Sequence, residues 1–146
     1  MNTLNFPDAN VWLALIYEDH VHSEAARAWF ENCAEEQFFF CRFTQITVLR
    51  LLTTPKVMAG GAVGMPEAWR LWDRITEDER IAFLDEPPGL EPEFRGLTRL
   101  ATPSPKEWAD SYLVAFASAA SLKLVTFDRA MKALSRNVFV IEAKHI

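Results

Sequence analysis

Two stretches near opposite ends of the chain decide the fold. Residues 3–8 read Thr-Leu-Asn-Phe-Pro-Asp, and residues 122–128 read Leu-Lys-Leu-Val-Thr-Phe-Asp. Both alternate or cluster apolar residues in a way that predicts short β-strands. Each strand ends at an aspartate, Asp8 or Asp128. In an open parallel sheet, ligands bind outside the carboxyl ends of the strands. The two aspartates therefore converge on one site if these strands are neighbours.

The intervening sequence alternates between helical and strand patterns. Apolar runs predict further strands at 38–41, 81–84 and 138–141, and helical spacing predicts helices at 11–16, 24–33, 44–54, from 66 onward, 94–101, 104–121 and 129–135. Pro55 ends the third helix, and the glycine-containing segment 56–64 indicates a loop. Such alternation predicts the α/β class, with a parallel sheet covered by helices on both faces and no second domain.

The helix expected from Ser104 carries a third carboxylate, Asp110. Ser104 is a candidate N-cap, and Glu107 is placed to complete a capping box. Asp110 shares a helical face with apolar residues three, four and seven positions later: Leu113, Val114 and Ala117. A charged carboxylate on a buried face costs several kcal/mol, about the penalty of burying any unpaired ion, unless it is paired or binds a metal. Alternatively, Asp110 lies near the helix start, partly exposed and favoured by the helix dipole.

Three carboxylates at one sheet edge would make an oxygen-rich site of the kind that suits Mg²⁺ or Mn²⁺. One metal can generate a hydroxide nucleophile, and a second can stabilise the leaving oxygen, which points to phosphodiester hydrolysis. For Asp8 and Asp128 taken singly, the alternative is that each only caps the helix that follows it.

Composition narrows the function further. The net charge of −5 counts against a simple nucleic-acid-binding module, because phosphate contacts usually require a basic surface. An acidic cluster that recruits cations, or a basic partner, fits this charge better. Cys33 and Cys41 lack zinc-site spacing, which indicates free thiols in a reducing compartment. We find no pattern of a signal peptide or a membrane span and expect a cytoplasmic protein.

Three motifs resemble those of PIN domains. The segment Phe6-Pro7-Asp8-Ala9-Asn10 resembles the opening strand and Asp-x-Asn motif of that family. The segment 110–115, Asp-Ser-Tyr-Leu-Val-Ala, resembles its Asp-x-x-Leu-x-Ala helix motif, and 125–128, Val-Thr-Phe-Asp, resembles its Thr-x-Asp strand end. The motifs occur in the family order and together extend over most of the chain.

This resemblance implies a three-layer α/β/α sandwich with a mainly parallel sheet, formed by a single PIN domain over residues 1–146. It implies that Asp8, Asp110 and Asp128 bind Mg²⁺ or Mn²⁺ and are catalytic. Chains of this size resemble VapC-type toxins, which are endoribonucleases that often act on transfer or ribosomal RNA. The partners implied are the RNA substrate, a cognate antitoxin and a second copy of the chain in a homodimer.

One region departs from the family pattern. PIN nucleases usually have a fourth acid near the start of the helix after the second strand, and residues 43–50 contain none. Gln45 or Thr47 can take that position and hold a metal-bound water, or Glu18 or Asp19 can approach instead. The departure leaves open whether one metal binds or two.

Further polar residues are candidates for supporting roles or for contacts with the substrate. They are Asn10 in the first motif, Arg50 and Thr126. The guanidinium of Arg50 suits phosphate, and Thr126 faces the same side of its strand as Asp128. His20 and His22 form a short pair after the first helix, for which surface residues are the simplest interpretation and RNA contact an alternative. We interpret Trp29, Trp72 and the Phe38–Phe40 run as core or oligomer interface.

Two other functions are consistent with parts of the pattern. The missing fourth acid permits a PIN-like module that binds RNA or protein without turnover. Strand-end aspartates also occur in phosphoryl-transfer and receiver domains. However, Asp8-Ala9-Asn10 lacks the second aspartate of such a nucleophile motif, and Lys123 begins its strand instead of ending it.

Overall fold

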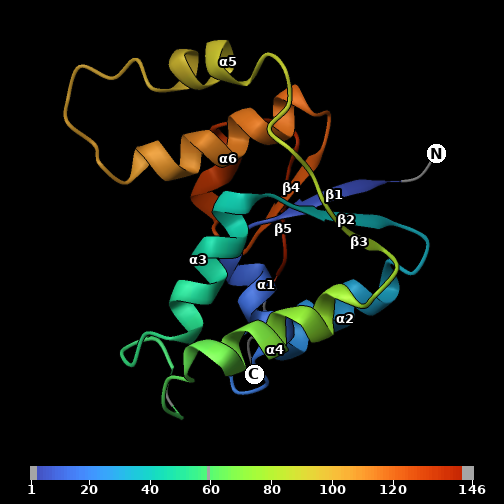
Figure 1. Ribbon diagram of the computed structural model, residues 1–146. Coiled ribbons are helices and arrows are strands. Elements are labelled where there is room, and N and C mark those ends of the chain that lie inside the picture. The colour runs from blue at the N-terminus through green and yellow to red at the C-terminus, as the bar shows by residue number, and fades with distance from the viewer. Residues whose placement is uncertain (1–2, 59, 143–146) are drawn as a thin grey trace.

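A five-stranded sheet forms the centre of the molecule. The computed structural model describes residues 3–58 and 60–142. The strands are β1 (Leu4–Pro7), β2 (Gln37–Phe40), β3 (Ile81–Phe83), β4 (Lys123–Thr126) and β5 (Val138–Val140). They pair in the order β3-β2-β1-β4-β5, and every pairing is parallel (Figure 1). The predicted α/β class is confirmed, and β1 and β4 are direct neighbours.

Helices cover both faces of this sheet, as Figure 1 shows. On one face lie α1 (Ala9–Ile16), α2 (Ser23–Asn32), α3 (Arg42–Leu52) and α4 (Met65–Thr76). On the other lie α5 (Leu90–Leu97), α6 (Glu107–Ala119) and the short 3₁₀ helix η1 (Arg129–Ala133). Successive side chains along a strand point to opposite faces of the sheet: Leu124 packs with α6, whereas Val125 packs with α1. The three-layer sandwich is therefore confirmed.

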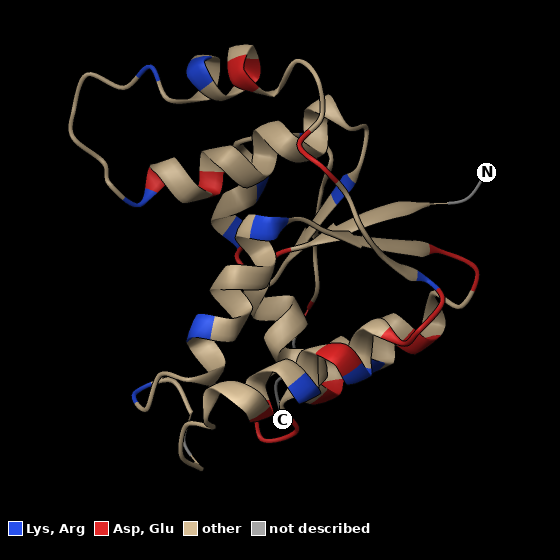
Figure 2. Ribbon diagram, in the orientation of Figure 1, with Lys and Arg blue, Asp and Glu red and all other residues tan. Residues whose placement is uncertain are grey.

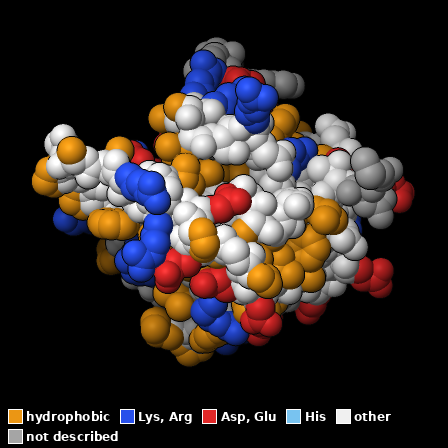
Figure 3. Space-filling view, turned by 90° about the horizontal axis from the view of Figure 1, so that it is seen from above, with side chains coloured by type: hydrophobic (Ala, Val, Ile, Leu, Met, Phe, Trp, Pro, Cys, Tyr) orange, Lys and Arg blue, Asp and Glu red, His pale blue; other side chains and the backbone are white. Residues whose placement is uncertain are grey.

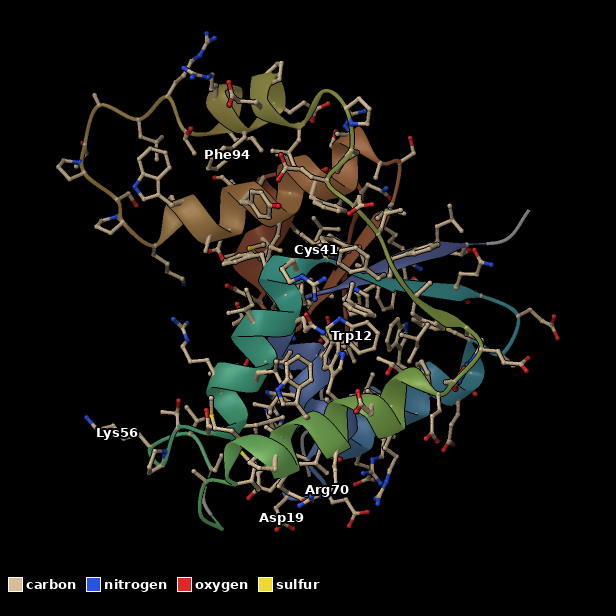
Figure 4. All side chains as sticks on the ribbon, viewed as in Figure 1. Trp12, Asp19, Cys41, Lys56, Arg70 and Phe94 are labelled. Atoms are coloured by element: carbon tan, nitrogen blue, oxygen red, sulfur yellow. The ribbon has the colours of Figure 1, made fainter. Side chains whose placement is uncertain are left out.

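Aromatic side chains fill much of the core. Trp12 on α1 is fully buried and meets Phe40 and Trp72 edge-on, with ring centroids 6.3 and 6.0 Å away (Figure 4). On the opposite face, Phe6 stacks on Phe116 at 4.6 Å. Such pairs add specific geometry to apolar burial and hold the helices in register with the strands. The interpretation of Trp72 as a core residue is confirmed.

Other large apolar side chains lie on the surface. Trp69 on α4 is 48% exposed and Trp108 on α6 is 59% exposed. Figure 3 shows hydrophobic side chains between charged ones on the face seen from above in the view of Figure 1, the side on which α5 lies. No helix among residues 3–58 and 60–142 is long and apolar enough to cross a bilayer.

Two predicted helix starts are wrong. Ser104 does not cap a helix: α6 begins at Glu107 after Lys106, and Ser104 instead accepts a turn hydrogen bond of 3.0 Å from the Glu107 N–H through its backbone carbonyl. The helix expected at 94–101 is α5, which starts at Leu90 directly after Gly89 (φ +85°) and ends near Thr98. A left-handed glycine reverses the chain there, so the helix begins earlier than the apolar spacing indicated.

Candidate functional site

Asp8 joins the ends of two adjacent strands. Its backbone N–H donates to the Val125 carbonyl across the sheet at 2.9 Å. Its carboxylate Oδ1 accepts a hydrogen bond of 3.1 Å from the backbone N–H of Val11, which caps α1. The other oxygen, Oδ2, accepts one of 2.5 Å from the Thr126 hydroxyl. Asp8 therefore acts as a helix cap, yet it also faces the end of β4.

Thr126 links the Asp8 carboxylate to the backbone of Asp128. Its side chain is fully buried at the end of β4, and its hydroxyl oxygen accepts the backbone N–H of Asp128 at 3.0 Å. Asp128 in turn caps η1 through a hydrogen bond of 2.9 Å from Ala130. The Lys106 ammonium lies 4.0 Å from Asp128 Oδ2. One buried hydroxyl thus fixes the positions of Asp8 and Asp128 together.

Asp110 lies in the first turn of α6 and is half-buried. The apolar residues that share its face, Leu113, Val114 and Ala117, are buried, as the spacing indicated. Burial raises the pKa of the Asp110 carboxyl, and repulsion from Asp128 and Glu107 adds to this, while Lys106 opposes it. The third carboxylate therefore interacts electrostatically with the strand-end pair.

The pKa of the Asp8 carboxyl is strongly raised. Burial raises its pKa to about 6, and repulsion from Asp110 contributes in the same direction. Hydrogen bonds from Thr126 and from the α1 backbone oppose the rise, because they stabilise the charged form. A cation bound between these groups would relieve both the burial cost and the repulsion. Figure 2 shows acidic residues in the first turn of α6, where Glu107 and Asp110 lie.

The donor set fits a hard divalent cation. Carboxylate oxygens are the ligands that Mg²⁺ and Mn²⁺ prefer, and Mg²⁺ commonly keeps several waters and uses one or two carboxylates. Within residues 3–58 and 60–142, no three His, Cys, Asp or Glu side chains are grouped closely enough to hold one ion together. The arrangement therefore suits an ion held by one or two carboxylates, with water and substrate oxygens completing its coordination.

A hollow of about 350 Å³ opens beside the strand ends. Its lining combines the polar residues of the first motif and of β4 with a loop between α1 and α2: Asp8, Asn10, His20, Val21, His22, Thr126, Phe127 and Asp128. Asp110 is not among these lining residues. The sequence favours surface positions for His20 and His22, with RNA contact as the alternative, and the structure places both at the hollow. Their position directly after the motif helix was a signal that they lie near the site.

The remaining candidates lie outside this hollow. Gln45 is buried and accepts a hydrogen bond from Arg42, while Thr47 donates to the Phe43 carbonyl of its own helix at 2.8 Å. Arg50 lines a separate groove between α3 and α4.

Neither candidate for the missing fourth acid lines the hollow either. Glu18 is 81% exposed and pairs with Arg27 at 3.6 Å, and Asp19 is exposed. Among the described residues, the hollow is lined by two carboxylates, Asp8 and Asp128. Cys33 and Cys41 are free thiols, as the sequence indicated.

Comparison with known proteins identifies the class. The model of the PIN domain family matches residues 6–137, so the chain belongs to that family. It is 43% identical over 130 residues to "Ribonuclease VapC41" of Mycobacterium tuberculosis, which covers 84% of this chain and 88% of the relative. The resemblance to PIN domains of the VapC type is thereby confirmed, and the phosphoryl-transfer alternative is not supported.

Solved structures share the fold at low sequence identity. The VapBC2 complex of Rickettsia felis, bound to a promoter DNA fragment, contains a chain with a TM-score of 0.68, 12% identity and coverage of 94% of this chain and 97% of that one. VapC20 of M. tuberculosis, described as a toxin that cleaves the sarcin-ricin loop, gives a TM-score of 0.66 at 14% identity, with 96% and 99% coverage. These similarities support the fold.

Proposed function

We propose that the chain is a divalent-metal-dependent endoribonuclease and the toxin of a type II toxin–antitoxin pair. The observation that carries this proposal is the hydroxyl of Thr126, which holds Asp8 and Asp128 together at the ends of adjacent strands. Its 43% identical relative is named a ribonuclease, and the structural neighbour VapC20 cleaves a loop of RNA. We therefore propose RNA, with transfer or ribosomal RNA expected, as the substrate.

In this proposal each residue has a defined task. Asp8 and Asp128 would hold Mg²⁺ or Mn²⁺, and Asp110 would contribute negative charge to the same ion. When bound, such an ion supplies an activated water and neutralises charge that develops on the phosphate. Thr126 orients Asp8 by its hydrogen bond. Lys106, 4.0 Å from Asp128, balances charge at the edge of the site, and Asn10 offers an amide to the substrate from the hollow.

The test is cleavage of purified total RNA with Mg²⁺ or Mn²⁺. We expect discrete fragments from the wild type, none with a chelator and none from Asp110→Asn. Cleavage that survives both controls would show that the nuclease site lies elsewhere. Among the described residues only two carboxylates line the hollow, and this favours one second candidate, a PIN-like module that binds without turnover. Metal binding and RNA binding without fragments under either ion would select it.

We also propose an antitoxin docking site in the groove between α3 and α4. This groove of about 370 Å³ is predominantly apolar, and it is lined by Ile46, Leu49, Arg50, Thr53, Met65, Ala68 and Trp69. Ile46 is 55% exposed and Met65 is 70% exposed, so a partner that covers them would bury substantial apolar surface. The structural neighbours include VapBC2 and FitAB, each bound to a DNA fragment. An apolar helix bearing a carboxylate would complement Arg50.

Three further expectations belong to the same proposal. The toxin would act in the cytoplasm, where transfer and ribosomal RNA take part in translation. It would form a homodimer, as the family resemblance implies. The chain would work as one PIN domain, because the matched region 6–137 contains β2, β3 and β4, the end of β1 and every candidate site residue.

A further inference from the structure

The loop between α1 and α2 brings two histidines to the carboxylates. His20 and His22 line the same hollow as Asp8 and Asp128, although more than a hundred residues of sequence separate them from the β4 end. Val21 between them is 85% exposed. Since the proposed metal site occupies one side of this hollow, the histidines form a wall beside the place where an RNA phosphate would lie.

The ring of His20 is fixed in a defined orientation. Its Nδ1 accepts a hydrogen bond of 3.0 Å from the backbone N–H of His22. Backbone bonds of 3.1 Å from His20 N–H to the Tyr17 carbonyl and of 3.0 Å from Ser23 N–H to the His20 carbonyl tighten the same turn. A ring nitrogen that accepts a hydrogen bond carries no proton, so the neutral ring has its proton on Nε2. His20 therefore offers an Nε2–H donor.

The surroundings keep this ring neutral. Burial lowers the pKa of His20, and repulsion from His22 lowers it further. Protonation would also place a hydrogen on Nδ1 and break the hydrogen bond from His22. A neutral donor that is already oriented binds a phosphate oxygen without a large desolvation cost.

His22 and Phe127 hold the wall against β4. The ring of His22 packs on that of Phe127 with centroids 4.5 Å apart, and the ring of His20 lies nearly parallel to Phe127 at 6.4 Å. Phe127 is the residue between Thr126 and Asp128. The segment that carries Asp128 therefore also holds the histidine loop in place. The Nδ1 atom of His22 is buried and has no hydrogen-bond partner among the described residues.

We propose that His20 is a substrate-contacting residue that donates a hydrogen bond from Nε2 to a phosphate oxygen of the RNA in the hollow, and that His22 is a positioning residue. This inference rests on the proposed nuclease function. The chemistry fits because the hollow is otherwise acidic: Asp8 and Asp128 repel phosphate, and a metal ion there would neutralise only the phosphate it touches. A phosphate beside it requires a donor supplied by the protein. His20 suits this better than metal ligation, because its Nδ1 is already occupied.

The test is a series of substitutions at His20 that separates the two ring nitrogens. The amide nitrogen of glutamine reaches approximately the place of Nε2, whereas that of asparagine reaches only the place of Nδ1. We expect His20→Ala and His20→Asn to raise KM for RNA about tenfold, with kcat changed less than about twofold, because one hydrogen bond to a charged group is lost. His20→Gln should retain most of the affinity. Glu24→Gln, an exposed change in the first turn of α2, serves as the matched control.

Three outcomes would overturn the assignment. Unchanged KM in His20→Ala would remove any substrate contact. A loss confined to kcat, with His20→Gln as inactive as His20→Ala, would make His20 a proton-transfer group instead. A fall in thermal stability common to all three variants, with parallel losses in kcat, would make the histidine structural.

Failure of the proposed nuclease function can be distinguished from failure of the His20 assignment. If the wild type cleaves no RNA with either metal, the nuclease proposal fails. The dissociation constant of uncleaved total RNA, measured for the wild type and His20→Ala, would still decide whether His20 contacts RNA: tenfold weaker binding would support the contact, and equal binding would refute it.

Discussion

The polar hollow at the strand ends and the apolar groove between α3 and α4 are built in opposite ways. In the hollow, Asp8 and Asp128 are tied to the backbone by capping hydrogen bonds and to each other through Thr126. In the groove, Ile46, Met65 and Trp69 are large apolar side chains exposed on α3 and α4. Rigid positioning suits catalysis, and exposed apolar area suits recognition. We therefore expect substitutions in one region to spare the function of the other.

The largest effect is expected for Asp8→Asn. The amide keeps the α1 cap but removes the charge that would bind the metal. RNA cleavage, measured as kcat/KM with Mn²⁺, should fall by at least about a hundredfold, more than a typical loss of an outer hydrogen-bond partner. Binding of the antitoxin should be unchanged. An equal loss of RNA cleavage and of antitoxin binding would show that the hollow and the groove do not work independently.

The reciprocal change is Trp69→Glu in the groove. A charge at this 48% exposed position should weaken binding of the antitoxin about thirtyfold or more, because central aromatic anchors carry much of the interface energy. Cleavage of RNA by the free toxin should remain at the wild-type rate. Trp108→Glu, at a 59% exposed tryptophan outside the groove, is the matched control for titration calorimetry. Identical losses in both variants would show that the groove is not the docking site.

The pH dependence of stability should report the cost of holding Asp8 charged. Its folded pKa of about 6 exceeds the unfolded value of 3.8, so the folded state binds the proton more tightly. The associated stability is present below pH 4 and is lost as the pH rises through 6. In chelator, the free energy of unfolding of Asp8→Asn should therefore exceed that of the wild type by about 3 kcal/mol above pH 7, since one pKa unit corresponds to about 1.4 kcal/mol, and by little at pH 4.

Denaturant unfolding at several pH values measures this difference. Saturating Mn²⁺ should reverse it at pH 7, since the metal stabilises only the protein that binds it. A stability difference that does not vary with pH would show that burial does not perturb Asp8.

The smallest effect is expected for Thr126→Val. This variant keeps the shape of the buried side chain but removes the hydroxyl that bridges Asp8 and Asp128. The affinity for Mn²⁺ should fall about tenfold, as for other residues that orient a metal ligand. Thr126→Ser keeps the hydroxyl and should bind Mn²⁺ nearly as the wild type does. If valine and serine behave alike, the bridge does not position the carboxylates.

Much of the fold could be predicted because its signals are local. The strand ends at Asp8 and Asp128 and the buried face beside Asp110 follow from spacing in the sequence. The helix starts at Ser104 and Phe94 were wrong because tertiary context and the left-handed Gly89 overrode local capping and periodicity. The exact ends of a helix depend on such competition between local and tertiary contacts, whereas the existence of the helix depends on it less.

The sequence by itself determined the alternation of strands and helices, and with it the edge at which the aspartates gather. Only the tertiary structure decided what else reaches that edge. It placed His20 and His22 in the hollow and Arg50 in a different groove. The physical reason is that a side chain's register on its own element follows from a period of about two or 3.6 residues, whereas the path of a loop depends on packing against residues far along the chain.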